Sequence, residues 1–216
     1  MRMLLYLSAF LVFFGGLDLD AADEARPVSP DSSPKGVETL VFIRHGEKPN
    51  KEIGQLNCQG LNQALALPRV LTAKFGKPDY IFAPAPDRMS AAVGRFNYIR
   101  PLATIEPTAI ELGMPVNTDF GYTDIDGLRL ELTNKKYKDA LIIVAWEHHE
   151  LESVVKQVVG EFGGDPKEVP KWEGNDFDSI YIVRISNGEA AKSASFTLDH
   201  EGLDNLSTDC PDAKHQ

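Results

Sequence analysis

Residues 38–44 read ETLVFIR, a short run of β-branched and aromatic side chains that is followed directly by His45. A run of this kind is typical of a strand that is buried on both faces of a sheet. Two more such runs come later, DYIFA at 79–83 and DALIIVA at 139–145. We therefore expect three buried strands, well separated along the chain.

Apolar residues at helical spacing lie between and after these strands. They predict helices over 59–75, 100–112 and 150–162; Pro68 should bend or split the first, and Pro107 should kink the second. Two later runs, 178–185 and 193–198, predict further strands, and the Asn-Gly pair between them favours a hairpin. Strands that alternate with helices predict an α/β fold: a three-layer sandwich whose mostly parallel central sheet carries helices on both faces.

The two ends of the chain differ from its body. Residues 1–25 form a positively charged start and an apolar run shorter than the ~20 residues of a membrane-spanning helix, which is typical of a secretory signal. We expect a secreted or periplasmic protein with no stable membrane insertion of the mature chain. The alternatives are an uncleaved membrane anchor or an extra tail on a cytosolic protein. Residues 26–36 predict a flexible linker, 37–202 the folded domain, and 203–216 a polar, frayed tail.

The chain contains two cysteines, Cys58 and Cys210. In an exported protein they could form a disulfide that pins the tail, and otherwise they are two unpaired thiols. The spacing of the two cysteines does not decide between a disulfide and free thiols, because two cysteines define no geometry. They are too few for a disulfide framework or a structural zinc site.

Length and charge narrow the classes of function. The 216 residues fit a single domain with a full core. With 22 Lys and Arg against 32 Asp and Glu, the formal net charge is −10. An acidic surface repels nucleic acid and anionic lipid, so a general DNA or RNA binder is excluded. A small anionic substrate would need a local basic pocket. Nothing in the sequence indicates an oligomeric state.

Two of the three buried strands end at residues suited to chemistry, Arg44 to Gly46 and Glu147 to His149. In parallel sheets, ligands bind outside the carboxyl ends of the strands. A neutral histidine such as His45 is a competent nucleophile toward phosphorus, and an arginine offers a fork of donors to phosphate oxygens. A glycine beside them lets the backbone turn and leaves room for a substrate group. A second histidine across the bound group would stabilise charge on the transferred phosphoryl.

Four segments, in order, resemble the histidine phosphatase superfamily, also called the phosphoglycerate mutase-like fold. VFIRHGEKPN (41–50) is similar to its Arg-His-Gly signature, and LNCQGLNQALALPRVL (56–71) to the glycine and helix that follow. RPLATIEPTAIELGMPVN (100–117) resembles the helix that opens with a second pocket arginine, and ALIIVAWEHHELESVV (140–155) the strand that delivers a second histidine.

The resemblance implies a role for each matching residue. His45 would be the phosphorylated nucleophile, and Arg44, Arg100 and His148 would complete the phosphate pocket. His45 would attack the phosphoryl group while the alcohol departs, and water would then release phosphate. The family needs no metal and no organic cofactor for this reaction. The remaining candidates for contact with the substrate are Gly46, Glu47, Glu147, His149 and Arg88.

Several assignments stay open at this point. Arg88 is the alternative to Arg100 as the second arginine, and His149 is the alternative to His148. Glu147 either lines the pocket or lies in solvent. The run from Glu147 to His149 also raises the possibility of a metal site, but adjacent residues point in different directions, so we expect no bound metal.

The residue that protonates the leaving oxygen is the least defined. Asp119, Asp124 and Asp126 lie in the acidic stretch DFGYTDIDG, but each is more typical of a turn residue than of a catalytic acid.

The resemblance favours a phosphatase that hydrolyses phosphate monoesters through a phosphohistidine and takes a small phosphorylated substrate or phosphate. One alternative is a non-catalytic module that binds phosphate in the same pocket. Another is a phosphotransferase of the phosphoglycerate mutase type, which an export signal and a short chain disfavour. Pocket loops set the choice of substrate, and one sequence does not define their shape.

Overall fold

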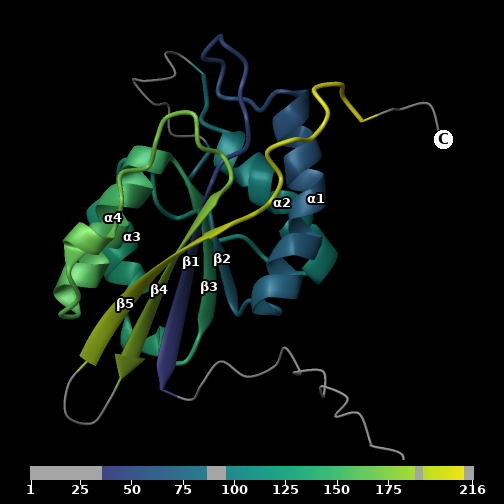
Figure 1. Cartoon of the computed structure of the whole chain (residues 1–216). Helices are drawn as coiled ribbons and strands as arrows, with labels where there is room; N and C mark the ends of the chain where they lie inside the picture. Colours follow the sequence, from purple (N-terminus) through teal and green to yellow (C-terminus); the bar gives the residue numbers. More distant parts are fainter. Residues whose placement is uncertain (1–35, 87–95, 188–191, 212–216) are drawn as a thin grey trace, which may run out of the picture.

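A computed structural model describes residues 36–86, 96–187 and 192–211 (Figure 1). The expected signal segment, nearly all of the expected linker, and Arg88 lie outside these described residues.

One five-stranded sheet forms the centre of the molecule, in the order β2-β3-β1-β4-β5. Strands β2, β3 and β1 are parallel, β4 runs antiparallel to β1, and β5 runs antiparallel to β4. The mostly parallel sheet is therefore confirmed, and so is the pairing of the last two strands. The strands are β1 (Val37–Arg44), β2 (Tyr80–Phe82), β3 (Leu141–Trp146), β4 (Ser179–Asn187) and β5 (Lys192–His200).

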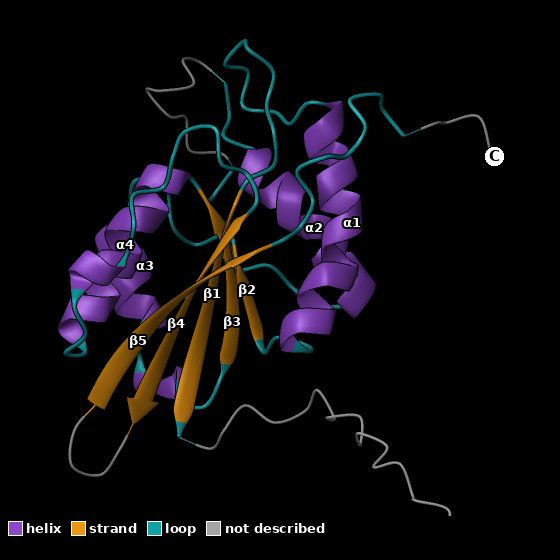
Figure 2. Cartoon of the chain, in the orientation of Figure 1, coloured by secondary structure: helices purple, strands orange, loops and turns teal. Residues whose placement is uncertain are grey.

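Helices cover both faces of this sheet, as a three-layer sandwich requires (Figure 2). Helices α1 and α2 pack on one face, and α3 and α4 on the other. The helices are α1 (Cys58–Phe75), α2 (Arg100–Leu112), α3 (Ile125–Leu132) and α4 (His148–Glu161), with short 3₁₀ turns η2 (Lys135–Tyr137) and η3 (Pro166–Glu168).

Alternation along β1 explains the two cores. Leu40 and Phe42 pack with residues of α3 and α4, whereas Val41 and Ile43 pack with residues of α1 and α2. Successive side chains of a strand point to opposite faces, so an unbroken apolar run serves both layers. The central strand is thereby fixed in register, and its carboxyl end is held rigidly.

The helices differ from the sequence pattern in two places. Helices α1 and α2 continue past Pro68 and Pro107, so neither proline splits its helix. The sequence pattern did not predict helix α3, which begins in the acidic stretch. Asp124 is its N-cap, and the Asp124 side chain accepts a hydrogen bond from the backbone N–H of Gly127. Helix α4 begins at His148, before the apolar residues that predicted it, because Glu147 caps it.

The C-terminal segment is bound rather than frayed over its described part. Cys58, the first residue of α1, forms a disulfide with Cys210. The side-chain amide of Asn62 donates hydrogen bonds to the carbonyls of Ser207 and Asp209, both at 2.8 Å. The expectation of a frayed tail is therefore wrong for residues 203–211, because side chains of α1 satisfy its backbone. Among the described residues, no helix is both long enough and apolar enough to cross a membrane.

Candidate active site

The carboxyl ends of β1 and β3 lie side by side, with Arg44 in register with Trp146. The backbone N–H of His45 donates a hydrogen bond to the Trp146 carbonyl at 3.1 Å, which extends the pairing one residue further. The residues after both strands therefore emerge at the same sheet edge, as predicted. Side chains from these two segments, α2 and the neighbouring loops surround a single cavity.

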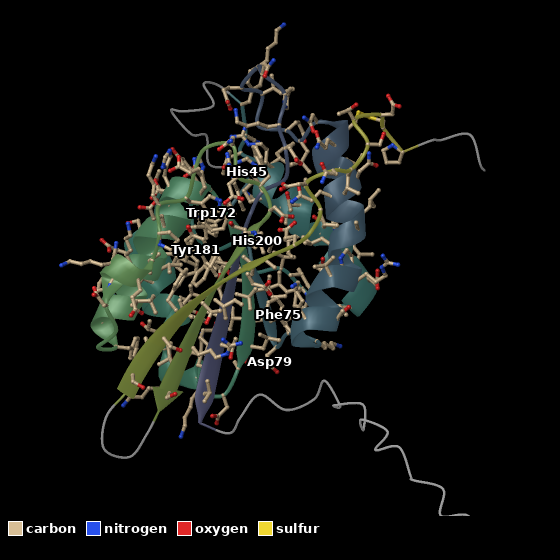
Figure 3. The ribbon with its side chains drawn as sticks, in the orientation of Figure 1. His45, Phe75, Asp79, Trp172, Tyr181 and His200 are labelled. Atoms are coloured by element: carbon tan, nitrogen blue, oxygen red, sulfur yellow. A yellow bond between two sulfur atoms is a disulfide. The ribbon has the colours of Figure 1, made fainter. Side chains whose placement is uncertain are left out.

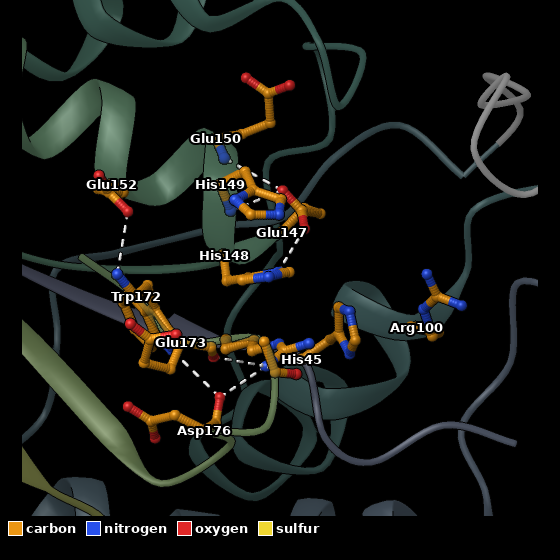
Figure 4. A network of polar contacts seen from close by, with 12 residues as sticks. His45, Arg100, Glu147, His148, His149, Glu150, Glu152, Trp172, Glu173 and Asp176 are labelled. Carbon is orange, nitrogen blue, oxygen red and sulfur yellow. Dashed lines mark hydrogen bonds and ion pairs between the residues drawn. The ribbon is translucent and has the colours of Figure 1, made fainter. Parts of the chain in front are cut away.

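The cavity has a volume of about 280 Å³ and is lined by all four residues expected to form the phosphate pocket. Figure 4 labels three of them, His45, Arg100 and His148. Its charge differs from the basic pocket that was expected, because three carboxylates accompany three cationic side chains. The lining residues are Arg44, His45, Lys48, Glu52, Tyr98, Arg100, Tyr122, Glu147, His148, His149 and Glu150.

His45 is almost fully buried, with 1% of its surface exposed, and its Nδ1 lies 2.7 Å from the carbonyl oxygen of Gly46. A carbonyl only accepts, so Nδ1 carries the proton and Nε2 keeps its lone pair. Burial, followed by the positive charge of Arg100, holds the pKa of His45 well below 6.5. His45 is thus neutral and in the tautomer that a nucleophile attacking through Nε2 requires.

Gly46 is packed closely against helix α1. Its backbone N–H donates to the hydroxyl of Thr104 at 2.9 Å. A Cβ at this position would lie 2.9 Å from the backbone of Gly60 and from the side-chain oxygen of Gln63. Gly46 is not among the residues that line the cavity, and helix α1 fills the space beside it.

Arg44 is buried; it lines the cavity and also donates hydrogen bonds to the loop before β4. Its Nη1 donates to the carbonyls of Gly174 at 3.0 Å and Asp176 at 2.7 Å, and the guanidinium lies 3.8 Å from the centre of the Phe177 ring. Burial lowers its pKa to about 10. Arg44 therefore also ties the loop that precedes β4 to the end of β1, a contact that the sequence did not reveal. Figure 3 labels the next residue, His45.

Arg100 enters the cavity as the first residue of α2 and is 4% exposed. Its Nη1 donates to the Glu52 carboxylate at 2.8 Å, and its guanidinium lies 4.8 Å from the ring centre of Tyr98. Its Nε is buried without a hydrogen-bond partner among the described residues. The alternative, Arg88, lies outside the described part of the chain.

Glu147 is the N-cap of α4 and lines the cavity. Its carboxylate accepts hydrogen bonds from the backbone N–H groups of His149 at 2.7 Å and Glu150 at 3.1 Å, and it contacts Nδ1 of His148. Burial alone would raise its pKa, but the hydrogen bond from His148 and the positive field around it outweigh burial and lower the pKa to about 2. Glu147 is therefore ionised.

Both histidines of the second motif reach the cavity, and they differ in burial. His148 is 8% exposed, whereas His149 is exposed. Both line the cavity, so the structure brings together the two candidates between which the sequence left the choice open.

Glu47 and the three candidate acids do not line the cavity. Burial and the charge of Asp204 raise the pKa of Glu47, and the positive charge of Arg44 partly offsets this rise. Asp119 bonds to Asn117 and Asp124 caps α3. Asp126 lies in the first turn of α3. The three aspartates thus have the local turn and capping roles that their sequence context favoured.

Five lining residues were not singled out from the sequence. Lys48 and Glu52 form an ion pair in the loop after the first motif, close to residues that the sequence did single out. Tyr98 lies two positions before Arg100, and its ring is 6.1 Å from that of His45 and 5.0 Å from that of Tyr122. For Lys48, Glu52 and Tyr98, the available signal was their closeness in sequence to the motifs. The other two of the five residues are Tyr122 and Glu150.

Comparisons with known proteins concern the fold. No family model matches the chain, and no curated protein matches it in sequence. A putative phosphohistidine phosphatase SixA from Nakamurella multipartitia is 15% identical, with 78% of this chain and 98% of that chain covered and a TM-score of 0.49. A phosphoglycerate mutase from Plasmodium falciparum is 13% identical, with 82% and 98% covered and a TM-score of 0.49.

A third solved structure, the protein histidine phosphatase SixA complexed with tungstate, is 15% identical, with 76% of this chain and 97% of that chain covered and a TM-score of 0.49. All three are at most 15% identical to this chain and have TM-scores below 0.5, so no activity is assigned from them.

Proposed function

We propose that the chain is a phosphatase that hydrolyses phosphate monoesters through a phosphohistidine on His45. The observation that carries the proposal is the state of His45: a buried, neutral imidazole with its Nδ1 proton held by a carbonyl, on a rigid strand end beside a cavity. The second motif reaches the same cavity from the adjacent strand.

The first half-reaction follows from this geometry. Nε2 of His45 donates its lone pair to phosphorus as the bond from phosphorus to the ester oxygen breaks. Arg100 and His148 lie in the same cavity as His45 and would donate hydrogen bonds to the phosphoryl oxygens as charge develops on them.

The departing oxygen needs a proton. Three carboxyls line the cavity, but Glu52 is paired with Lys48 and Arg100, and Glu147 caps α4. Within the described part of the chain, the Glu150 carboxylate has no hydrogen bond or ion pair, and burial raises its pKa. We therefore assign the donation of this proton to Glu150. Water then attacks the phosphohistidine, the nitrogen–phosphorus bond breaks, and phosphate leaves.

We also propose that the protein works in an oxidising compartment after export. The Cys58–Cys210 disulfide supports this, because such bonds persist mainly outside the reducing cytosol. An uncleaved N-terminal anchor in the same compartment is the alternative.

Turnover of p-nitrophenyl phosphate tests the proposed activity. Wild type should release p-nitrophenol, and His45→Ala should fall to background. His200→Ala is the matched control, because His200 is exposed on β5 and does not line the cavity. Binding of phosphate by wild type without any turnover would instead identify a non-catalytic phosphate-binding module.

A further inference from the structure

Three consecutive side chains at the start of α4 gather around one point. Glu147, His148 and His149 each offer a ligand atom, and these atoms lie within 4.8 Å of one another. The two imidazole rings have centres 4.0 Å apart and planes inclined by 32°. This contradicts the expectation that adjacent residues would point apart. The reason is the change of backbone at Glu147, which is extended, whereas both histidines lie in the first helical turn.

The burial of His148 is the second observation. The residue is 8% exposed, and its Nε2 is buried without a hydrogen-bond partner among the described residues. Its Nδ1 contacts the Glu147 carboxylate. A buried ring nitrogen whose lone pair has no partner costs free energy, and a cation coordinated by that lone pair would remove the cost. Figure 4 shows the His148 ring between those of His149 and His45.

We propose that Glu147, His148 and His149 form a zinc site at the side of the cavity. Two imidazoles and one carboxylate are ligands that Zn²⁺ accepts, and three protein ligands leave its fourth position to water or an anion. Mg²⁺ and Ca²⁺ prefer oxygen ligands throughout, so this donor set selects against them.

The zinc site shares His148 with the phosphate pocket. The effect of zinc on turnover that follows from this rests on the proposed function. A zinc ion on His148 fixes the ring to the metal and places a positive charge beside the phosphoryl position. It also occupies part of a cavity of about 280 Å³. Zinc and substrate therefore compete, and zinc inhibits the phosphatase.

Isothermal titration calorimetry on the untagged full chain, after treatment with EDTA, tests the site without any substrate. Wild type should bind one equivalent of ZnCl₂ and should not bind MgCl₂. His149→Ala, which removes an exposed ligand, should weaken binding by at least about tenfold, because even loss of an outer-shell partner costs about 10–100-fold. Glu147→Gln keeps an acceptor for the helix cap and should also weaken binding.

His200→Ala is the matched control and should leave zinc affinity unchanged, because His200 lies on β5, away from the cluster. Circular dichroism confirms that each variant is folded. Absence of zinc binding in wild type overturns the proposal, as does equal affinity in wild type and His149→Ala.

Turnover measured with and without ZnCl₂ tests the competition. Zinc should inhibit wild type, and His149→Ala should require at least about tenfold more zinc for the same inhibition. Zinc that leaves turnover unchanged or raises it overturns the competition. Zinc binding in a protein that shows no turnover in EDTA supports the site and overturns the proposed function, so the two failures are distinguishable.

Discussion

At the scale of the residue, Glu150 donates the proton to the leaving group in the proposed mechanism. Glu150→Gln keeps the shape of the side chain and removes the proton. We expect turnover of phenyl phosphate, whose leaving group is poor, to fall by about 10²-fold or more, since general acids contribute about 10²–10⁴-fold. Turnover of p-nitrophenyl phosphate should fall less, because its leaving group needs little protonation.

The comparison of the two esters in steady-state kinetics measures this difference. Glu106→Gln is the control, because Glu106 is exposed on α2 and does not line the cavity. Equal losses on both esters would count against Glu150 as the acid.

Glu201 is a buried carboxyl away from the cavity, 4% exposed, and its Oε2 accepts a hydrogen bond from Gln63 at 2.7 Å. Burial raises its pKa well above 4.5, and the negative charges of Asp178 and Glu47 add to the effect. The folded state therefore holds this proton more tightly than the unfolded state. Its contribution to stability is complete below pH 4.5 and is lost as the pH rises through the folded pKa.

Thermal unfolding between pH about 5 and about 8 tests this linkage. Glu201→Gln keeps an acceptor for Gln63 and cannot ionise, so its Tm should fall less across this range than that of wild type. Parallel Tm curves for the two proteins would show that Glu201 does not set the pH dependence.

At the scale of the element, the disulfide joins the start of α1 to the C-terminal segment, and 152 residues separate its two cysteines. A cross-link over so long a loop restricts the unfolded chain strongly. We expect the Cys58→Ser, Cys210→Ser double variant to lose about 2–4 kcal/mol of unfolding free energy, measured by urea denaturation.

The same variant should keep its turnover at temperatures where it is folded, because neither cysteine lines the cavity. Wild type in a reductant should match it in stability. An unchanged unfolding free energy would mean that the disulfide does not secure the tail.

The scale of the element also shows which features the sequence could predict. The apolar run of β1 and the position of His45 directly after it follow from local pattern, and so does the helix that opens at Arg100. Parallel pairing then brings Arg44 and Trp146 into register, so the convergence of two distant motifs follows from the topology.

Other features depend on contacts between distant segments and have no local signature. Gly46 is needed because α1 packs against it so closely that a Cβ there would lie 2.9 Å from the backbone of Gly60. Arg44 directs Nη1 to carbonyls some 130 residues away, such as that of Gly174, which no pattern near Arg44 reveals. The clustering of Glu147 with its neighbours arises from the turn between strand and helix.

At the scale of the whole molecule, an acidic chain of net charge −10 concentrates two buried arginines at one sheet edge. Glu52 partly neutralises Arg100 there, and Glu147 lies beside His148. The cavity is therefore a balanced polar site set in an acidic protein. In the proposed phosphatase, recognition of phosphate would rest on directed donors more than on net charge.

The central claim is that His45 carries the phosphoryl group during turnover. Rapid quenching of wild type with a phosphate monoester, followed by peptide mapping by mass spectrometry under alkaline conditions, tests it most directly. We predict one acid-labile phosphoryl group per chain, located on His45 and absent from His45→Ala. Turnover that proceeds without any phosphorylated histidine, or with the phosphoryl group on another residue, would contradict the account.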